Sequence, residues 1–178
     1  DNYIDVARAY MSGLEALSAR GGSPADVASV ASFFISRIDT LIDSKLDEKL
    51  TTADRPRERT ELQSLKGSVA ITNAKLTYQL YKKIATSPRW KELAEKGART
   101  QRLLWASTST KNPAYSDVRY VEELIGTDTV NTLPQATMDA FRDHGRTRPT
   151  IEGGISLAQD TMDLLESSGV SMFDCAEH

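Results

Sequence analysis

The segment LLWASTSTKNP, residues 103–113, decides how the fold is interpreted. It begins with apolar residues typical of a buried strand and continues into consecutive hydroxyl side chains and Lys111. Polar residues that directly follow a buried strand commonly form the ligand site of an α/β protein, because such sites lie beyond the carboxyl ends of parallel strands. Hydroxyl groups beside an ammonium group favour an anionic ligand, whereas a solvated loop without a ligand is the alternative interpretation.

The segments on either side alternate between helical and strand patterns. Apolar residues at helical spacing predict the helices, and short apolar runs predict three strands. The helices are expected over residues 2–19, 36–46, 62–84, 87–97, 118–125, 134–144 and 156–168, and the strands over 27–34, 103–106 and 127–133. This order is typical of parallel βα units. Three strands are too few for so many amphipathic helices, and a closed βα barrel has about 250 residues, so the pattern indicates part of a barrel.

The composition narrows the class of protein. With 178 residues, of which 39% are hydrophobic, the chain can bury a core as one domain or as part of a larger one. The net charge of −3 gives no general attraction for nucleic acid or an anionic membrane. Cys175 is the single cysteine, and no apolar run reaches the ~20 residues of a membrane span, so we expect a soluble, cytoplasmic protein. His144 and His178 lack partners at zinc-ligand spacing, so no metal site is expected.

A second strand end carries a similar set of polar groups. Ser32 lies near the end of the first predicted strand, and Arg37 follows at the entrance to a helix. An arginine suits a phosphate because it offers several donors in one plane, although a surface arginine that starts a helix is an equal alternative. Adjacent βα loops of a barrel open onto one face, so Arg37 and Lys111 together suggest a phosphorylated ligand. Asn131 either points into the barrel or caps the helix that starts at Pro134, and we favour the cap.

Three separate blocks of this sequence resemble bacterial transaldolase. They are ASFFISRID at residues 31–39, LWASTSTKNPAYSD at 104–117, and VEELIG at 121–126 followed by DTVNT at 128–132. The blocks occur in the order found in the family, and the resemblance covers nearly the whole chain. It implies a TIM-type (β/α)8 barrel, in which residues 1–178 are the C-terminal part of a single domain. They would supply roughly the last three strands and their helices, and the N-terminal strands would be missing from this chain.

The resemblance also implies the chemistry. Family enzymes transfer a dihydroxyacetone unit from sedoheptulose 7-phosphate or fructose 6-phosphate to glyceraldehyde 3-phosphate or erythrose 4-phosphate, in the pentose phosphate pathway. They hold the unit as a Schiff base on a lysine and need no metal or organic cofactor. Phosphorylated sugars are therefore the expected partners, while nucleic acid and membranes are not. A homodimer, and a sugar-phosphate isomerase fused to or following the enzyme, are compatible with the family.

The family residues carry over one by one. Ser32 and Arg37 match residues that line the substrate and phosphate sites, and Ser107 matches a serine that helps to bind phosphate. Many relatives have an arginine two residues after that serine. Gapless alignment puts Ser109 at this position, whereas a short insertion makes Lys111 the functional cation, and we favour Lys111 as a point charge for the phosphate.

The Schiff-base lysine and the acid and base carboxylates have no matching block in this chain. Lys66 and Lys75 lie on the long amphipathic helix, and neither follows a buried strand. We therefore expect no catalytic residue within these residues, and we expect the segment to be inactive by itself. The absence of a strand-borne lysine also favours an alternative function, which is a non-catalytic phosphosugar-binding or scaffold module.

Overall fold

Helices and strands alternate along the chain as the sequence predicts. The computed structural model describes residues 2–172. The helices are α1 (Asn2–Ala19), a 3-10 turn η1 (Pro24–Asp26), α2 (Ile35–Thr52), α3 (Pro56–Leu65), α4 (Val69–Ala85), α5 (Pro88–Glu95), α6 (Arg119–Glu123), α7 (Gln135–His144) and α8 (Ile155–Ser167). The strands are β1 (Val30–Phe34), β2 (Arg102–Ala106) and β3 (Thr129–Asn131).

The strands form one parallel sheet in the order β1-β2-β3, which confirms the expected α/β class with parallel βα units. Val30 pairs with Arg102 and Phe34 with Ala106, so the first two strands end at the same level. Leu104 pairs with Val130 in the third strand. The carboxyl ends of all three strands therefore lie at one edge of the sheet, where the loops that follow them come together.

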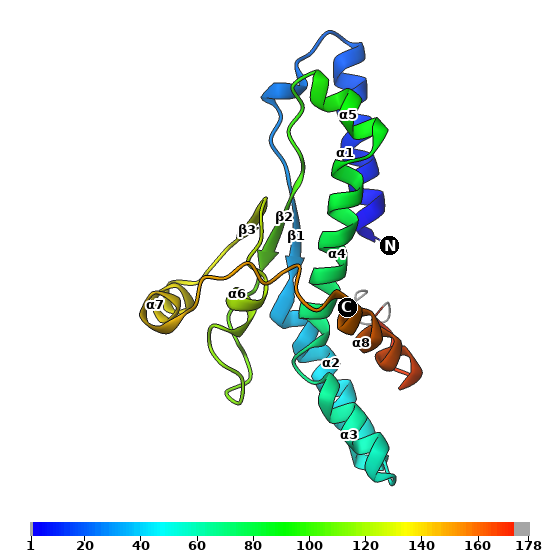
Figure 1. Cartoon of the computed structure of the whole chain (residues 1–178), viewed down its shortest axis with the longest axis vertical. Helices are drawn as coiled ribbons and strands as arrows, with labels where there is room; N and C mark the ends of the chain where they lie inside the picture. Colours follow the sequence, from blue (N-terminus) through cyan, green and yellow to red (C-terminus); the bar gives the residue numbers. More distant parts are fainter. Residues whose placement is uncertain (1, 173–178) are drawn as a thin grey trace.

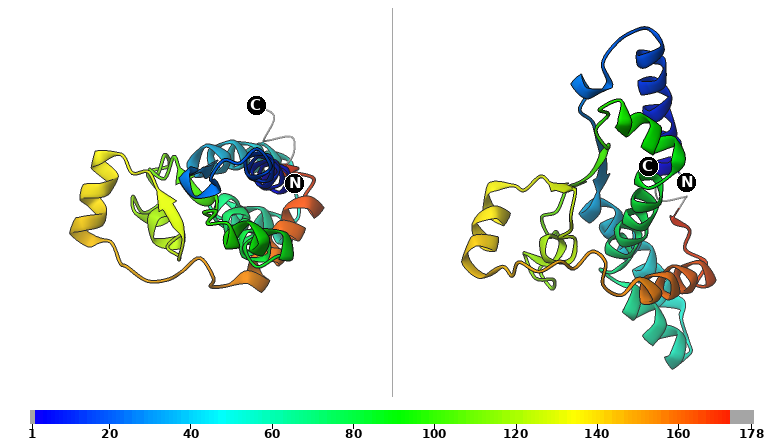
Figure 2. Two further views of the ribbon diagram at one scale, coloured as in Figure 1. Left: turned by 90° about the horizontal axis from the view of Figure 1, so that it is seen from above. Right: turned by 45° about the horizontal axis from the view of Figure 1, so that its top comes forward.

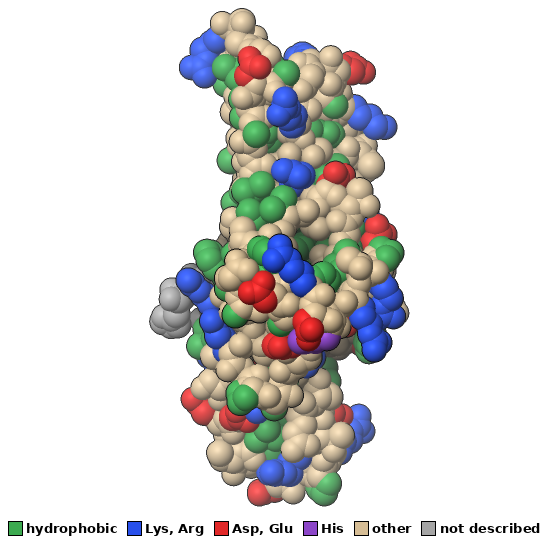
Figure 3. Space-filling model, turned by 90° about the vertical axis from the view of Figure 1, so that its left-hand side faces the viewer, with side chains coloured by type: hydrophobic (Ala, Val, Ile, Leu, Met, Phe, Trp, Pro, Cys, Tyr) green, Lys and Arg blue, Asp and Glu red, His purple; other side chains and the backbone are tan. Residues whose placement is uncertain are grey.

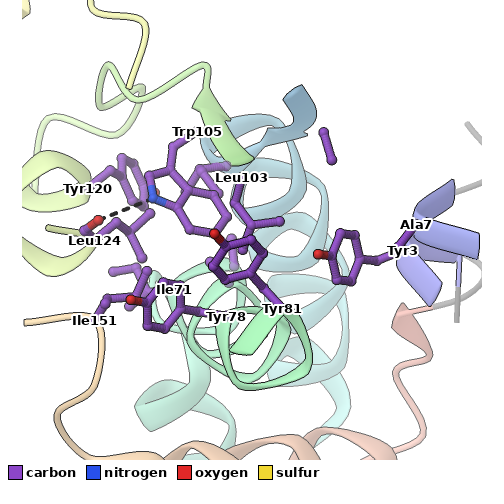
Figure 4. Packing of buried hydrophobic residues seen from close by; sticks show 14 residues of the cluster. Tyr3, Ala7, Ile71, Tyr78, Tyr81, Leu103, Trp105, Tyr120, Leu124 and Ile151 are labelled. Atoms are coloured by element: carbon purple, nitrogen blue, oxygen red, sulfur yellow. Dashed lines mark hydrogen bonds between the residues drawn. The ribbon is translucent and has the colours of Figure 1, made fainter. Parts of the chain in front are cut away.

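One face of the sheet packs against α4, which lies alongside β1 and β2 (Figure 1). Figure 4 shows Leu103 and Trp105 of β2 between the tyrosines of α4 and the residues of α6. Trp105 is fully buried, and its indole N–H donates a hydrogen bond of 3.1 Å to the carbonyl of Leu124. The alternation of β2, in which Leu103 and Trp105 are buried, thus fixes which face of the sheet carries the helical layer.

The opposite face of the sheet carries no helical layer in the described part of the chain. Its side chains include Val30, which is 39% exposed, Phe34, which is 45% exposed, and Ser32 between them. Helix α7 stands apart from the other helices, beyond β3 (Figures 1 and 2). Parallel sheets are normally covered on both faces, so this uncovered face is unusual for a sheet of this type.

The first strand is shorter than the sequence predicts. The apolar run 27–34 predicts a strand over its whole length, but pairing begins only at Val30, opposite Arg102. Residues 27–29 follow the turn η1 and have no opposing β2 residue. The Gln101 side-chain amide donates to the Ser29 hydroxyl at 2.9 Å instead. An apolar run shows which residues are buried but not where its partner strand starts.

The long helix predicted over residues 62–84 is two helices, and the preceding helix runs on to Thr52 into the charged stretch. Helix α3 ends at Leu65 and α4 begins at Val69. Gly67 lies between them with a φ of 67°, the left-handed region that ends helices and that glycine adopts most easily. The continuous periodicity was misleading because both helices bury apolar side chains toward the interior.

Several local predictions are confirmed. The Ser87 hydroxyl accepts a hydrogen bond of 3.3 Å from the Trp90 backbone N–H and caps α5, with Pro88 as the first helical residue. Helices α7 and α8 begin next to Pro134 and Ser156 as expected. On the face drawn in Figure 3, basic and acidic side chains are interspersed. Within residues 2–172, none of the helices has the length and apolar character needed to cross a membrane.

Candidate functional site

Two of the loops that leave the sheet meet where α2 begins. The backbone N–H of Ser36, in the first turn of α2, donates a hydrogen bond of 2.9 Å to the carbonyl of Ser107. The hydroxyls of the same two residues lie 3.2 Å apart, and Ser36 is fully buried. Because Ala106 pairs with Phe34, Ser107 comes directly level with the start of the helix. The first turn of α2 is thus fastened to the end of β2.

Ser107 adopts a left-handed backbone conformation with a φ of 56°. A residue other than glycine enters this region at a cost of about 1–2 kcal/mol, so its surroundings must hold it there. The chain turns at Ser107, and the next residue, Thr108, becomes fully buried. The Thr108 hydroxyl donates a hydrogen bond of 2.7 Å to the side-chain oxygen of Asn131. The turn is fixed by the hydrogen bond between Ser36 and Ser107 on one side and by that between Thr108 and Asn131 on the other.

Asn131 does not cap the helix after β3, so the interpretation we favoured from the sequence is wrong. The residue at the cap of α7 is Pro134, and no side chain supplies a capping hydrogen bond there. The Asn131 side chain instead accepts from Thr108, which joins the ends of β2 and β3. The distance of three residues between Asn131 and Pro134 made the cap plausible, but the pairing of β3 with β2 decides the contact.

The two predicted cations are both exposed at this edge of the molecule. The Arg37 guanidinium lies 4.5 Å from the centre of the Phe34 ring, and the Lys111 ammonium donates to the Ser109 hydroxyl at 3.2 Å. Among residues 2–172, neither cation has a carboxylate as a salt-bridge partner. Both charges are therefore available to an anionic ligand.

Ser32 lies apart from these groups, on the uncovered face of the sheet. It pairs with Leu104, and Ser107, just after the end of β2, follows three residues later, which corresponds to roughly 10 Å along the strand direction. The structure thus brings Ser107 to α2 and Lys111 to Ser109, whereas Ser32 sits deeper on the sheet face.

Three residues of this site were not selected from the sequence as site residues: Ser36, Thr108 and, in its observed role, Asn131. Ser36 could have been noticed, because a hydroxyl in the first turn of a helix beside Arg37 is a common anion-binding arrangement. Thr108 and Asn131 carry no comparable signal. Their contact depends on the pairing of β2 with β3, in which Leu103 is opposite Thr129, and these two strands have no local pattern in common.

Lys75 and Lys66, the two lysines considered from the sequence, both have carboxylate partners. The Lys75 side chain is only 13% exposed, and its ammonium forms an ion pair of 2.8 Å with Glu123. Lys66, which follows α3, pairs with Asp47. Both lie on or beside helices rather than on a strand, as expected. No strand of residues 2–172 contains a lysine.

His144 at the end of α7 fastens that helix to the loop after β2. Its Nε2 lies 2.9 Å from a carboxylate oxygen of Asp117, and its Nδ1 lies 3.2 Å from Asp143. These contacts raise the pKa of His144 above 6.5, with the Asp117 hydrogen bond as the larger cause. The same contact lowers the pKa of Asp117. The charged pair is thus favoured below the pKa of His144 in the folded protein.

We expect His144 to titrate above the pKa of an unperturbed histidine. Because the folded pKa is raised, the stabilisation is full below the unfolded pKa and is lost as pH rises through the folded pKa. An NMR titration of the imidazole, assigned with His144→Gln, measures this pKa. Asp117→Asn should move it back toward the unperturbed value by more than Asp143→Asn does. Equal effects of the two variants would contradict the larger role of Asp117.

The comparisons with known proteins cover this site and the whole chain. Residues 1–178 match the family described as transaldolase/fructose-6-phosphate aldolase. A transaldolase of Trichodesmium erythraeum is 52% identical over 172 residues, which are 97% of this chain and 45% of that protein. A protein named transaldolase 2 from Nostoc sp. is 51% identical over 96% of this chain and 45% of its own length. A transaldolase of Frankia alni is 46% identical over 99% of this chain and 46% of its own length. The chain therefore spans about half the length of these relatives.

Proposed function

Because the chain belongs to the transaldolase/fructose-6-phosphate aldolase family, we propose that the protein is a transaldolase and that residues 1–178 bind the sugar phosphate. The observation that carries the proposal is the joint of Ser36 and Ser107, where the first turn of α2 faces the end of β2. Arg37 lies in the same helical turn, and Lys111 follows Ser107 by four residues. The N-terminus of a helix has N–H groups without partners inside the helix and the positive end of the helix dipole, both of which favour a phosphate. In α2 the Ser36 N–H already donates to the Ser107 carbonyl, so the dipole and the other N–H groups of the first turn are what the helix offers to the phosphate.

We propose further that the sheet is part of a TIM-type (β/α)8 barrel, to which this chain contributes roughly the last three strands as the C-terminal part of a single domain. Two features support this. The sheet face with Val30, Ser32 and Phe34 is uncovered, and the outer edges of β1 and β3 have no partner strand among residues 2–172. Further strands of a longer protein would pair with these edges, and the uncovered face would become the interior of the barrel.

The proposed reaction transfers a dihydroxyacetone unit between phosphorylated sugars. The amine of a lysine outside residues 1–178 adds to the ketone carbon of the donor sugar, and a water molecule leaves as the Schiff base forms. The carbon–carbon bond next to the bound unit then breaks and releases an aldehyde. The retained unit adds to the acceptor aldehyde, and water hydrolyses the Schiff base to return the free lysine. Carboxylates outside residues 1–178 move the protons.

Within this scheme, the residues of this chain hold the substrate. Ser107, Arg37 and the first turn of α2 bind the phosphate at the edge of the sheet, and Ser32 contacts the sugar deeper on the face. Lys111 rather than Ser109 supplies the second cation. The contact between the Lys111 ammonium and the Ser109 hydroxyl supports this choice, because it puts the charge beside the position that gapless alignment matches to the family arginine. Lysine then neutralises the phosphate as a point charge.

Borohydride trapping with fructose 6-phosphate tests the function. In the full-length protein, we expect reduction of the Schiff base to leave one dihydroxyacetone unit on a single lysine, which peptide mass spectrometry locates outside residues 1–178. An adduct on a lysine within residues 1–178 would contradict the proposed division of the site. The absence of any adduct, together with retained binding of fructose 6-phosphate, would favour a non-catalytic phosphosugar-binding module.

A further inference from the structure

Tyr115 connects the loop after β2 to the helical layer. This residue lies four positions after Lys111, and its hydroxyl donates a hydrogen bond of 2.6 Å to one carboxylate oxygen of Asp43 in α2. The other oxygen of Asp43 accepts a hydrogen bond of 2.9 Å from the backbone N–H of Gly67. Asp43 is buried, so each of its oxygens is used to join a different segment. The loop, α2 and the α3–α4 joint thus share one carboxylate.

The ring of Tyr115 packs directly on Gly67. A side-chain carbon added at Gly67 would come within 2.6 Å of the Tyr115 ring, closer than two carbon atoms can approach. The Arg119 guanidinium also lies 4.9 Å from the centre of the ring. The break between α3 and α4 therefore provides the surface on which Tyr115 is seated. A residue with a side chain at position 67 would leave no room for the ring.

The turn between Lys111 and Tyr115 is itself fixed by hydrogen bonds. The Asn112 side-chain oxygen accepts from the Ala114 backbone N–H at 2.9 Å, and the Asn112 carbonyl accepts from the Tyr115 backbone N–H at 3.1 Å. The Thr110 hydroxyl donates to the Ser116 carbonyl at 2.8 Å. A displacement of Tyr115 would therefore be passed on to Thr110 and Lys111 rather than absorbed by a slack loop.

We propose that Tyr115 is a positioning residue for phosphate binding, which holds Lys111 in place through its seat on Asp43 and Gly67. This inference rests on the proposed function, because it assumes that Lys111 contacts the phosphate of the substrate. Burial and the neighbouring Asp43 raise the pKa of Tyr115, so the hydroxyl keeps its proton and remains a donor at neutral pH.

The variant that tests the proposal is Tyr115→Phe in the full-length protein, which removes the hydroxyl and keeps the ring. We expect the KM for fructose 6-phosphate and the inhibition constant of inorganic phosphate to rise together by about five- to tenfold, because the loop loses one hydrogen bond to a charged group. The kcat should stay within about twofold, because Tyr115 does not touch the reacting atoms. Tyr10→Phe is the matched control, since it removes the hydrogen bond of 2.9 Å that the hydroxyl of Tyr10, on α1, donates to the carbonyl of Arg99, between α5 and β2, and it should change none of these constants.

Two further variants separate this inference from the proposed function. Lys111→Ala should weaken the binding of inorganic phosphate by more than Tyr115→Phe does. The double variant should bind phosphate no more weakly than Lys111→Ala alone, because Tyr115 acts through Lys111. If Lys111→Ala leaves phosphate binding unchanged, the proposed phosphate site is wrong. If Lys111→Ala weakens binding while Tyr115→Phe lowers only the melting temperature, or if the two effects add, the positioning role of Tyr115 is overturned and the phosphate site stands.

Discussion

Asp39→Leu is expected to lower the free energy of unfolding by about 3 kcal/mol, whereas Asp39→Asn should change it by less than about 1 kcal/mol. Asp39 is 1% exposed, and its carboxylate accepts a hydrogen bond of 2.8 Å from the backbone N–H of Ala70. Ala70 lies in the first turn of α4, where the Ser68 side chain makes no capping hydrogen bond. Leucine would leave the Ala70 donor buried and unpaired, while asparagine keeps an oxygen in the same place.

The charge of Asp39 adds a pH dependence to this expectation. Burial raises the pKa of Asp39, and the Ala70 N–H and the Tyr120 hydroxyl lower it by less. For a group whose pKa is raised on folding, the stabilisation is full below the pKa of the unfolded chain and is lost as pH rises through the folded pKa. Asparagine does not titrate in this range. The free energy of unfolding of Asp39→Asn, relative to that of the unsubstituted protein, should therefore increase as pH rises from the acidic range to neutral.

Denaturant unfolding of the full-length protein, followed by tryptophan fluorescence at two pH values, measures both effects. Asp54→Leu is the matched control, because Asp54 lies exposed between α2 and α3 and should tolerate leucine within about 0.5 kcal/mol. If Asp39→Leu costs no more than Asp54→Leu, then Asp39 does not cap α4 across the helical layer.

The break between α3 and α4 is a feature that the sequence pattern does not predict. Helical periodicity identified the apolar faces of both helices, because that signal is local and comes from burial on one side. The break itself depends on Asp39 and Asp43, which lie 31 and 24 residues from the N–H groups that they accept from. Gly67 alone is a weak signal, since a glycine inside a helical pattern costs only about 1 kcal/mol relative to alanine. Contacts between residues this far apart in the chain do not change the spacing of apolar residues, so the sequence pattern does not reveal them.

The candidate site divides in the same way. Ser107 and Lys111 could be selected because they follow an apolar run, and that position alone predicts the carboxyl end of a strand. Which residue of α2 meets Ser107 is set by the register of β1 against β2, in which Phe34 pairs with Ala106. A slip by one residue would replace Ser36 with a neighbour on the other side of the turn. The sequence predicts where each strand ends, but the register decides which side chains from neighbouring strand ends lie next to each other.

Ser107→Val is expected to abolish phosphate binding in the full-length protein and to lower the free energy of unfolding by about 2–3 kcal/mol. Ser107 holds a φ of 56°, and a β-branched side chain in this region is strained beyond the cost that serine already bears. The turn would then open, and Thr108 would leave its buried contact with Asn131. Both the hydroxyl that faces Ser36 and the direction of the following loop would be lost.

Two smaller substitutions separate the hydroxyl of Ser107 from its backbone conformation. Ser107→Gly removes the hydroxyl but adopts the left-handed conformation without strain, so the fold should be retained or slightly stabilised. Ser107→Ala removes the same hydroxyl and keeps the strain. Both variants should lower the affinity for fructose 6-phosphate by about 10- to 100-fold, which is the effect of one lost hydrogen bond to a charged group. Phosphate binding by Ser107→Val at the level of Ser107→Ala would show that the left-handed turn is not needed. The hydroxyl and the turn both lie at the joint of Ser36 with Ser107. The three variants therefore measure how much of the phosphate affinity comes from that joint and how much is left to Arg37 and Lys111.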